Sequence, residues 1–149
     1  MEIAALGDDY EAMFDRGWTD GLPVVPPTEY LVAGMLEGTT CDSDEVVALV
    51  PPNLAECTIE KVAINAVMAG CLPEYMPVII AAVEAMVEEP FNLHGIQSTT
   101  NPVAVALIVN GPVRNRLLIN CQSGCFGPGW RANATIGRAV RLIQLNIGG

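Results

Sequence analysis

The order of hydrophobic and polar positions changes period several times along the chain, and helical spacing dominates. Apolar residues recur every three or four positions over residues 59–69. Thr58 before them suits a helix N-cap, and Gly70 after them suits the end of the helix. The same spacing continues over residues 74–88, where Pro77 either kinks the helix or marks its true start. The pattern predicts helices over residues 8–17, 29–37, 59–69, 74–88 and 130–144.

Other stretches have the composition of strands. Residues 45–50 form a β-branched run closed by two prolines. Residues 103–109, Val-Ala-Val-Ala-Leu-Ile-Val, are apolar throughout, which is typical of a strand buried on both faces of a sheet. We also expect short strands at residues 95–99 and 117–120, and an extended segment at 145–147. This alternation predicts an α/β (or α+β) fold: a single domain over residues 1–149, with a small, largely buried sheet flanked by four to five helices.

The composition favours a well-packed core and a cytoplasmic location. Hydrophobic residues make up 51% of the 149 and charged residues only 16%, which argues against disorder. The longest apolar run, residues 76–83, is far shorter than the roughly 20 residues that a membrane-spanning helix needs. Acidic residues stand at the N-terminus where a secretory signal would have basic ones, and five cysteines do not suggest a disulfide framework. We therefore expect a cytoplasmic protein with no membrane partner.

The charge is divided unevenly between the two ends of the chain. All 17 acidic residues lie before residue 94, together with Arg16 and Lys61, while residues 94–149 contain only arginines as charged groups. Either the two halves pair inside one fold, or the arginines meet an anionic ligand or an acidic partner chain. Nucleic acid is not expected as a partner, because the net charge of −10 repels phosphate and no basic patch with interleaved aromatic residues occurs.

The densest group of reactive residues, Cys-Gln-Ser-Gly-Cys-Phe-Gly-Pro-Gly over residues 121–129, precedes the last predicted helix. Its three glycines let the backbone turn or approach a ligand closely, and the free N–H groups at the start of the helix suit an anion. A cysteine at such a place is activated toward the thiolate, so Cys125 is the first candidate nucleophile and Cys121 the second. The alternative is that both are small buried hydrophobes beside an ordinary turn.

Residues near this loop supply candidate substrate contacts. Arg131 lies in the first turn of the helix, where its charge opposes the helix dipole, which suggests a carboxylate partner or an anionic ligand. It shares one helix face with Thr135 and Arg138, and that face is either solvated or a docking surface for an acidic chain. Asp20 is a candidate site carboxylate, although a turn-capping aspartate fits the same position. The predicted substrate contacts are Asp20, Thr99, Thr100, Asn101, Gly127, Gly129, Trp130, Arg131 and Asn133.

A second polar loop, residues 94–101, precedes the apolar run at 103–109, and polar loops at strand ends are where α/β folds place sites. His94, the single histidine, is a candidate base for a cysteine if the fold brings the two together; a hydrogen-bonded structural histidine is the alternative. A metal site made by Cys121, Cys125 and His94 is a further alternative. The Cys-x3-Cys spacing is not that of a zinc half-site, so no metal or other cofactor is predicted.

Several long segments carry a resemblance to a known family. Residues 18–28 are Trp-Thr-Asp-Gly-Leu-Pro-Val-Val-Pro-Pro-Thr, and residues 126–139 are Phe-Gly-Pro-Gly-Trp-Arg-Ala-Asn-Ala-Thr-Ile-Gly-Arg-Ala. With residues 60–71 and 91–95, they resemble a bacterial family described as UGSC-family (seleno)proteins or thiol/disulfide oxidoreductase-like proteins, some of which lie beside alkylmercury-lyase-like domains. The Cys-Gly-Ser-Cys motif of that description is absent here, so thiol redox chemistry is not carried over. Because members of the family continue beyond the position of Gly149, the resemblance implies that a separate polypeptide completes the site.

These observations leave three hypotheses for function. The first is an enzyme, or one subunit of an enzyme, that acts on a small, anionic organic substrate through Cys125, with His94 moving protons. Lyase, hydrolase and oxidoreductase chemistry fit it equally. The second is a non-catalytic subunit or binding module of a hetero-oligomer, and the third is a metal-dependent enzyme. The hypotheses share the expectation of a homo- or hetero-oligomer with a second polypeptide.

Overall fold

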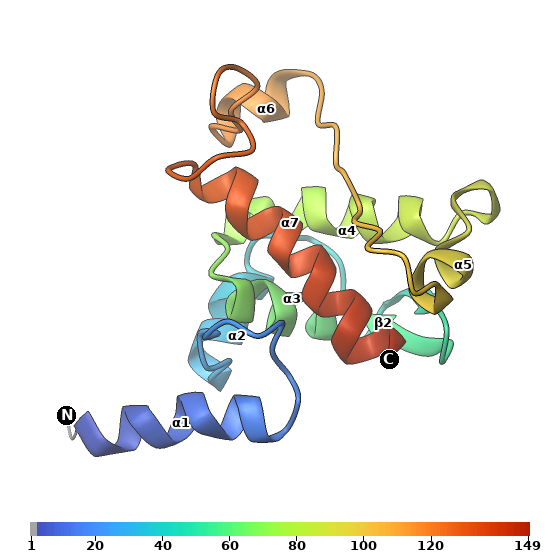
Figure 1. Ribbon diagram of the computed structural model, residues 1–149. Coiled ribbons are helices and arrows are strands. Elements are labelled where there is room, and N and C mark those ends of the chain that lie inside the picture. The colour runs from blue at the N-terminus through green and yellow to red at the C-terminus, as the bar shows by residue number, and fades with distance from the viewer. Residues whose placement is uncertain (1–2) are drawn as a thin grey trace.

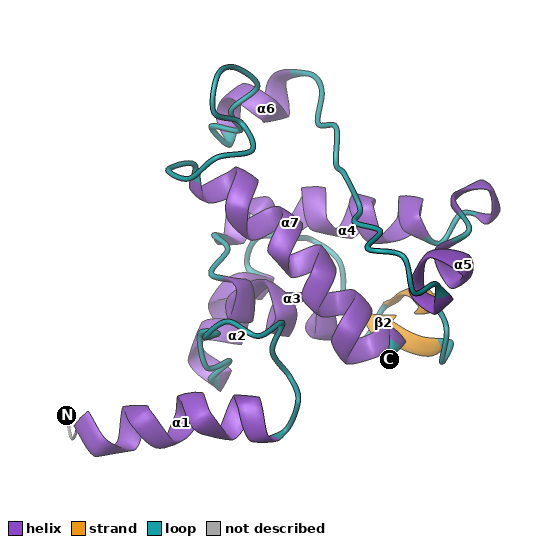
Figure 2. Cartoon of the chain, viewed as in Figure 1, coloured by secondary structure: helices purple, strands orange, loops and turns teal. Residues whose placement is uncertain are grey.

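The computed structural model describes residues 3–149 and shows an α+β fold in which helices predominate (Figure 1). The elements are α1 (Ile3–Asp15), α2 (Glu29–Leu36), β1 (Val46–Val50), β2 (Ala55–Thr58), α3 (Ile59–Ala69), α4 (Met76–Met86), α5 (Leu93–Ser98), α6 (Pro112–Arg116) and α7 (Arg131–Ile143). Strands β1 and β2 pair antiparallel in a two-stranded sheet (Figure 2). Every helix among residues 3–149 is too short or too polar to cross a lipid bilayer.

Helix α3 is the centre of the hydrophobic core. It packs against α7, α2 and α4, and we call these four helices the body. Val62, Ala63 and Ala66 of α3 have no exposed surface, and neither has Ala139 of α7. Alanines at these positions let the helix axes approach closely, which a core with few aromatic side chains requires. The body is therefore held together by close contact between small side chains.

The ends of the predicted helices are confirmed where capping residues mark them. The hydroxyl oxygen of Thr58 accepts a hydrogen bond from the Lys61 N–H at 3.3 Å, and Gly70 ends α3 with a φ of 85°. Thr28 caps α2 in the same way, through the Leu31 N–H. Pro77 stands in the first turn of α4, so it marks the start of that helix.

The prediction of a strand buried on both faces at residues 103–109 is wrong. The segment is extended, but it pairs with no strand of the described chain, and much of it is exposed. Its side chains alternate between half-buried and exposed, and Ile108 is 87% exposed. Figure 2 shows it as a long loop that runs from α5 to α6. We call residues 99–130, which include this segment and α6, the arm.

The two shorter strand predictions and the predicted extended segment at residues 145–147 are also wrong. Residues 95–99 fall mainly in α5, which forms because the side chain of Asn92 accepts a hydrogen bond from the Gly95 N–H. Residues 117–120 form a turn after α6, and residues 145–147 continue α7 as a wider helical turn. The sheet is consequently smaller than predicted, and the set of helices larger.

Candidate functional site

The loop that precedes α7 is organised by one side chain. Asn133, in the first turn of α7, accepts a hydrogen bond from the Asn120 N–H at 2.8 Å and donates to the Asn120 carbonyl at 2.9 Å. It also donates to the Cys125 carbonyl at 3.1 Å. All three contacts go to backbone groups, so Asn133, predicted as a substrate contact, fixes the loop to the helix.

The glycines of this loop differ in what they contribute. Gly124 and Gly129 have φ values of 80° and 105°, in the left-handed region that other residues rarely adopt. Gly127 is not in that region, but a Cβ added there would lie 3.3 Å from the Gly124 carbonyl oxygen. Helix α7 then begins after Trp130 without a side-chain cap. The chain thus turns sharply just before the helix.

Cys121 lies in a hollow between this loop and α6. An Nη1 N–H of Arg114 donates a hydrogen bond to the Cys121 sulfur at 3.0 Å, and Cys121 is exposed. The hollow has a volume of about 310 Å³, and we call it the thiol hollow. Its lining includes Arg114, Asn120, Cys121, Gln122, Ser123 and Trp130. It combines one cation, one thiol and several neutral polar groups, which suits a small anionic ligand.

Cys125, the first candidate nucleophile, is placed differently. It is half-buried and does not line the thiol hollow, and its backbone carbonyl is bound by Asn133. The neighbouring Phe126 is completely exposed. The structure therefore places the two cysteines differently: Cys121 lines the hollow, whereas Cys125 contributes its backbone carbonyl to the contact with Asn133.

Arg131 has a different partner from the one that the sequence suggested. Its Nε donates to the Gly70 carbonyl at 3.0 Å and an Nη2 N–H donates to the Cys71 carbonyl at 3.4 Å. These are carbonyls at the end of α3, where the helix dipole favours a cation. The expected carboxylate or ligand is thus replaced by the C-terminal end of a second helix.

Two further cysteines, Cys57 and Cys71, are buried in the core. Burial raises the pKa of both thiols to about 11, although Lys61 acts in the opposite direction on Cys57. The Cys71 thiol donates a hydrogen bond to the Thr135 carbonyl at 3.3 Å. For these two residues, the interpretation of cysteine as a small hydrophobe holds.

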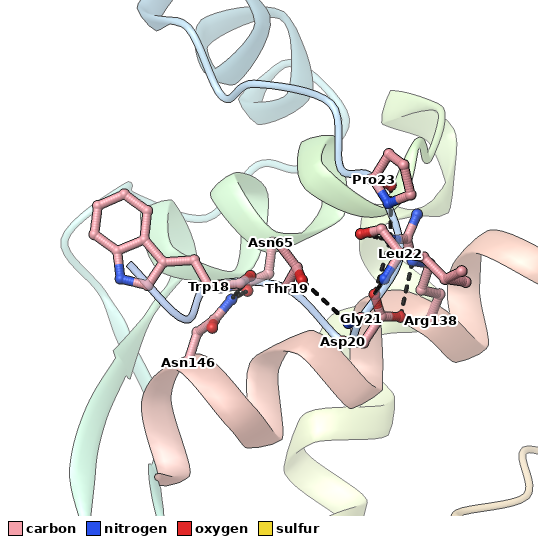
Figure 3. Close-up of polar contacts among 9 residues, drawn as sticks. All are labelled: Trp18, Thr19, Asp20, Gly21, Leu22, Pro23, Asn65, Arg138 and Asn146. Carbon is pink, nitrogen blue, oxygen red and sulfur yellow. Dashed lines mark hydrogen bonds and ion pairs between the residues drawn. The ribbon is translucent and has the colours of Figure 1, made fainter. Parts of the chain in front are cut away.

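Asp20 and Arg138 join the two oppositely charged ends of the chain (Figure 3). The Arg138 guanidinium donates to both carboxylate oxygens of Asp20, at 3.0 and 2.8 Å, and to the carbonyls of Leu22 and Pro23. The hydrogen bonds from Arg138 hold the pKa of the Asp20 carboxyl below its ordinary value, while partial burial opposes that shift. Asp20 also accepts from the Leu22 N–H, as a turn-capping aspartate does. Its carboxylate therefore fixes the proline-rich segment to α7.

His94 does not meet either cysteine of the loop. It is exposed on α5, and Figure 1 shows α5 on the opposite side of the molecule from the loop between α6 and α7. Thr99, Thr100 and Asn101 come directly after α5 and are not among the residues that line the thiol hollow. The metal site made by His94 and two cysteines is not assembled either, because no cluster of three suitable ligands occurs among the residues described.

Sequence reasoning missed Arg114, which approaches Cys121 from α6, and a polar pair in the body. Asn65 of α3 is buried, and its side-chain oxygen Oδ1 accepts a hydrogen bond from the side-chain amide of Asn146 at 2.7 Å (Figure 3). Asn146 also donates to the Trp18 carbonyl at 3.3 Å. All three line an apolar hollow of about 590 Å³ between α2 and α3. An asparagine at an apolar position of the helical pattern was the available signal for Asn65.

The comparisons with known proteins add nothing to this geometry. No family model, curated protein or solved structure matches the chain. The resemblance to UGSC-family proteins therefore stays a prediction.

Proposed function

We propose that the chain is an enzyme, or one subunit of an enzyme, that binds a small anionic organic substrate in the thiol hollow and attacks or holds it with Cys121. The observation that supports this most directly is the 3.0 Å contact between the Arg114 guanidinium and the Cys121 sulfur, in a hollow open to solvent. Cysteines beside an arginine in partly exposed surroundings belong to the reactive class, whereas cysteines among apolar side chains do not.

In this proposal, three of the residues that line the hollow have a role. Arg114 holds the negative charge of the substrate next to the sulfur, and Trp130 provides an apolar wall. No histidine, lysine or carboxylate is among the lining residues described. When the sulfur adds to an electrophilic carbon that carries a double bond, a sulfur–carbon bond forms, the π bond breaks and its electron pair moves to the other atom of the double bond, while the thiol proton leaves to water. The proposal therefore makes Cys121, and not Cys125, the nucleophile, and it gives His94 no part in moving protons.

Alkylation by a charged and a neutral reagent tests the proposal. Iodoacetate is anionic and iodoacetamide is its neutral counterpart, so the ratio of their rates at one cysteine measures local anion preference. Cys41 is an internal control, because it is exposed, stands next to Asp42 in the sequence, and has no arginine hydrogen-bonded to its sulfur among the residues described. We expect the rate ratio at Cys121 to exceed that at Cys41 by about tenfold, measured by peptide mass spectrometry.

Two arginine variants make the test specific. Arg114→Gln is expected to lower the ratio at Cys121 to that of Cys41. Arg116→Gln removes a positive charge from the same helix, but Arg116 does not donate to the Cys121 sulfur. This variant is therefore expected to keep most of the preference of Cys121 for iodoacetate. Equal ratios at Cys121 and Cys41 in the unaltered protein would contradict the proposal and favour the non-catalytic binding module.

A further inference from the structure

The extended segment of the arm has unused hydrogen-bonding groups along both edges. Between residues 104 and 110, no backbone N–H donates and no carbonyl accepts a hydrogen bond within the described chain. An extended backbone whose N–H and C=O groups are unpaired has the same free groups as the edge strand of a sheet. Such an edge is a template on which another chain can pair. Among the described residues, this apolar segment therefore has no partner for its backbone.

The side chains of this segment form two apolar rows. Val105, Leu107 and Val109 are half-buried, while Ala104, Ala106 and Ile108 are exposed. An apolar hollow of about 520 Å³ lies between residues 105–110 and α4, where it is lined by Ala81, Ala82 and Ala85. A second strand laid beside the first would cover these small side chains of α4.

Charge favours a second copy of the same chain as the partner. Each chain carries a net charge of −10, so two copies repel each other over most of their surfaces. From residue 90 to residue 113, however, the sequence contains no Asp, Glu, Lys or Arg. Two copies can meet along this stretch without opposing like charges, and the stretch offers no charge that would select a different, oppositely charged chain.

We propose that two copies of the chain associate by antiparallel pairing of residues 103–109 about a two-fold axis at Ala106. This register places Ala104 opposite Ile108 of the second copy, and Val105 opposite its Leu107. Small and large side chains then alternate on the exposed face, and branched side chains face each other on the α4 side. The contact is isologous, so this edge of the strand joins two copies and no more. The dimer does not depend on the thiol hollow.

Cross-linking at the proposed axis tests both the pairing and its register. Cys41 and Cys121 are first replaced by serine to remove the exposed thiols. Ala106→Cys in this background is then expected to form an intermolecular disulfide under mild oxidation, because residue 106 lies opposite itself. Ile108→Cys is the matched control in the same segment, and it is expected to form no cross-link, because the two residues 108 of the dimer lie four positions apart along the paired strands. Linkage at 108 in preference to 106, or at neither, would overturn the proposal.

Sedimentation of the full chain supplies a second measurement. The unaltered protein is expected to shift from monomer to dimer with increasing concentration. Ala106→Lys places two like charges at the axis and should weaken dimerisation at least about tenfold. Tyr30→Lys makes the same charge change at an exposed site on α2 and should leave dimerisation unaltered. A monomer at every concentration, a larger assembly, or equal effects of the two lysines would contradict this dimer.

Discussion

The body and the arm are both apolar in sequence, yet they use their apolar residues in opposite ways. In the body, the apolar side chains of α3 and α7 are sealed against each other. In the arm, an equally apolar segment lies extended with Ile108 almost fully exposed. The difference lies in the backbone, because a helix satisfies its own N–H and C=O groups and a single strand cannot. Burial of a strand therefore requires a neighbour, which the sequence of the strand does not specify.

The two regions also differ in how they use charge. In the body, Arg131 and Arg138 are satisfied by carbonyls and by Asp20. In the arm, Arg114 contacts a thiol, and Arg116 is exposed without an ion pair among the residues described. The arginines of the body fix the fold, while those of the arm are free to meet a ligand. Four experiments test how the body and the arm differ, beginning with the largest expected effect.

Deleting the same atoms from one isoleucine of each region should give unequal losses of stability. Ile143 of α7 has no exposed surface, so Ile143→Ala should lower the free energy of unfolding by about 4 kcal/mol through lost burial and the cavity left behind. Ile108→Ala should change it by less than about 0.5 kcal/mol. Urea unfolding of dilute protein, followed by circular dichroism, measures both. Similar losses would mean that the arm is packed as the body is.

The cysteines of the two regions should differ in reactivity by at least about a hundredfold. At pH 8, a thiol with a pKa of about 11, such as Cys71, is thiolate in only about one molecule in a thousand. Its burial also excludes reagent. Cys121 should therefore react with an aromatic disulfide reagent in the native protein, while Cys57 and Cys71 react only after unfolding. Rapid labelling of Cys71 in the native protein would show that the body opens at α7.

Removing one arginine from each region should separate their structural roles. Arg138→Leu leaves the partly buried Asp20 carboxylate and two carbonyls without their donor, and should cost about 2 kcal/mol of stability. Arg116→Leu removes an exposed arginine and should cost less than about 0.5 kcal/mol. Equal costs would show that the arm also depends on its arginines for folding.

The Asp20–Arg138 pair should also be visible in the pH dependence of stability. Because the folded-state pKa of Asp20 is depressed, its contribution is fully present above the unfolded pKa of about 3.9 and is lost as pH falls through the folded pKa. The unfolding free energies of the unaltered protein and of Asp20→Asn should thus converge below about pH 4. A constant difference over that range would exclude the pair as its source.

The parts of the fold that were predictable depend on near neighbours in the sequence. The Thr58 cap and the Gly70 stop of α3 were confirmed because each acts within one helical turn. The α5 helix was missed because its cap, Asn92, precedes a segment that was interpreted as a strand. In the candidate site, Cys121 was included, but its partner Arg114 was not, since their contact depends on the turn between them.

The sequence by itself determined the four helices of the body, the caps of α2 and α3 and the uneven distribution of charge, because periodicity and capping are local properties of the chain. Only the tertiary structure decided that Asp20 meets Arg138, that Arg131 binds the end of α3, and that α5 with His94 lies away from the loop that contains Cys121 and Cys125. Contacts between residues far apart in the chain depend on how whole helices pack against one another. One helix face can pack in several ways, and the choice is made only when the neighbouring helices are in place.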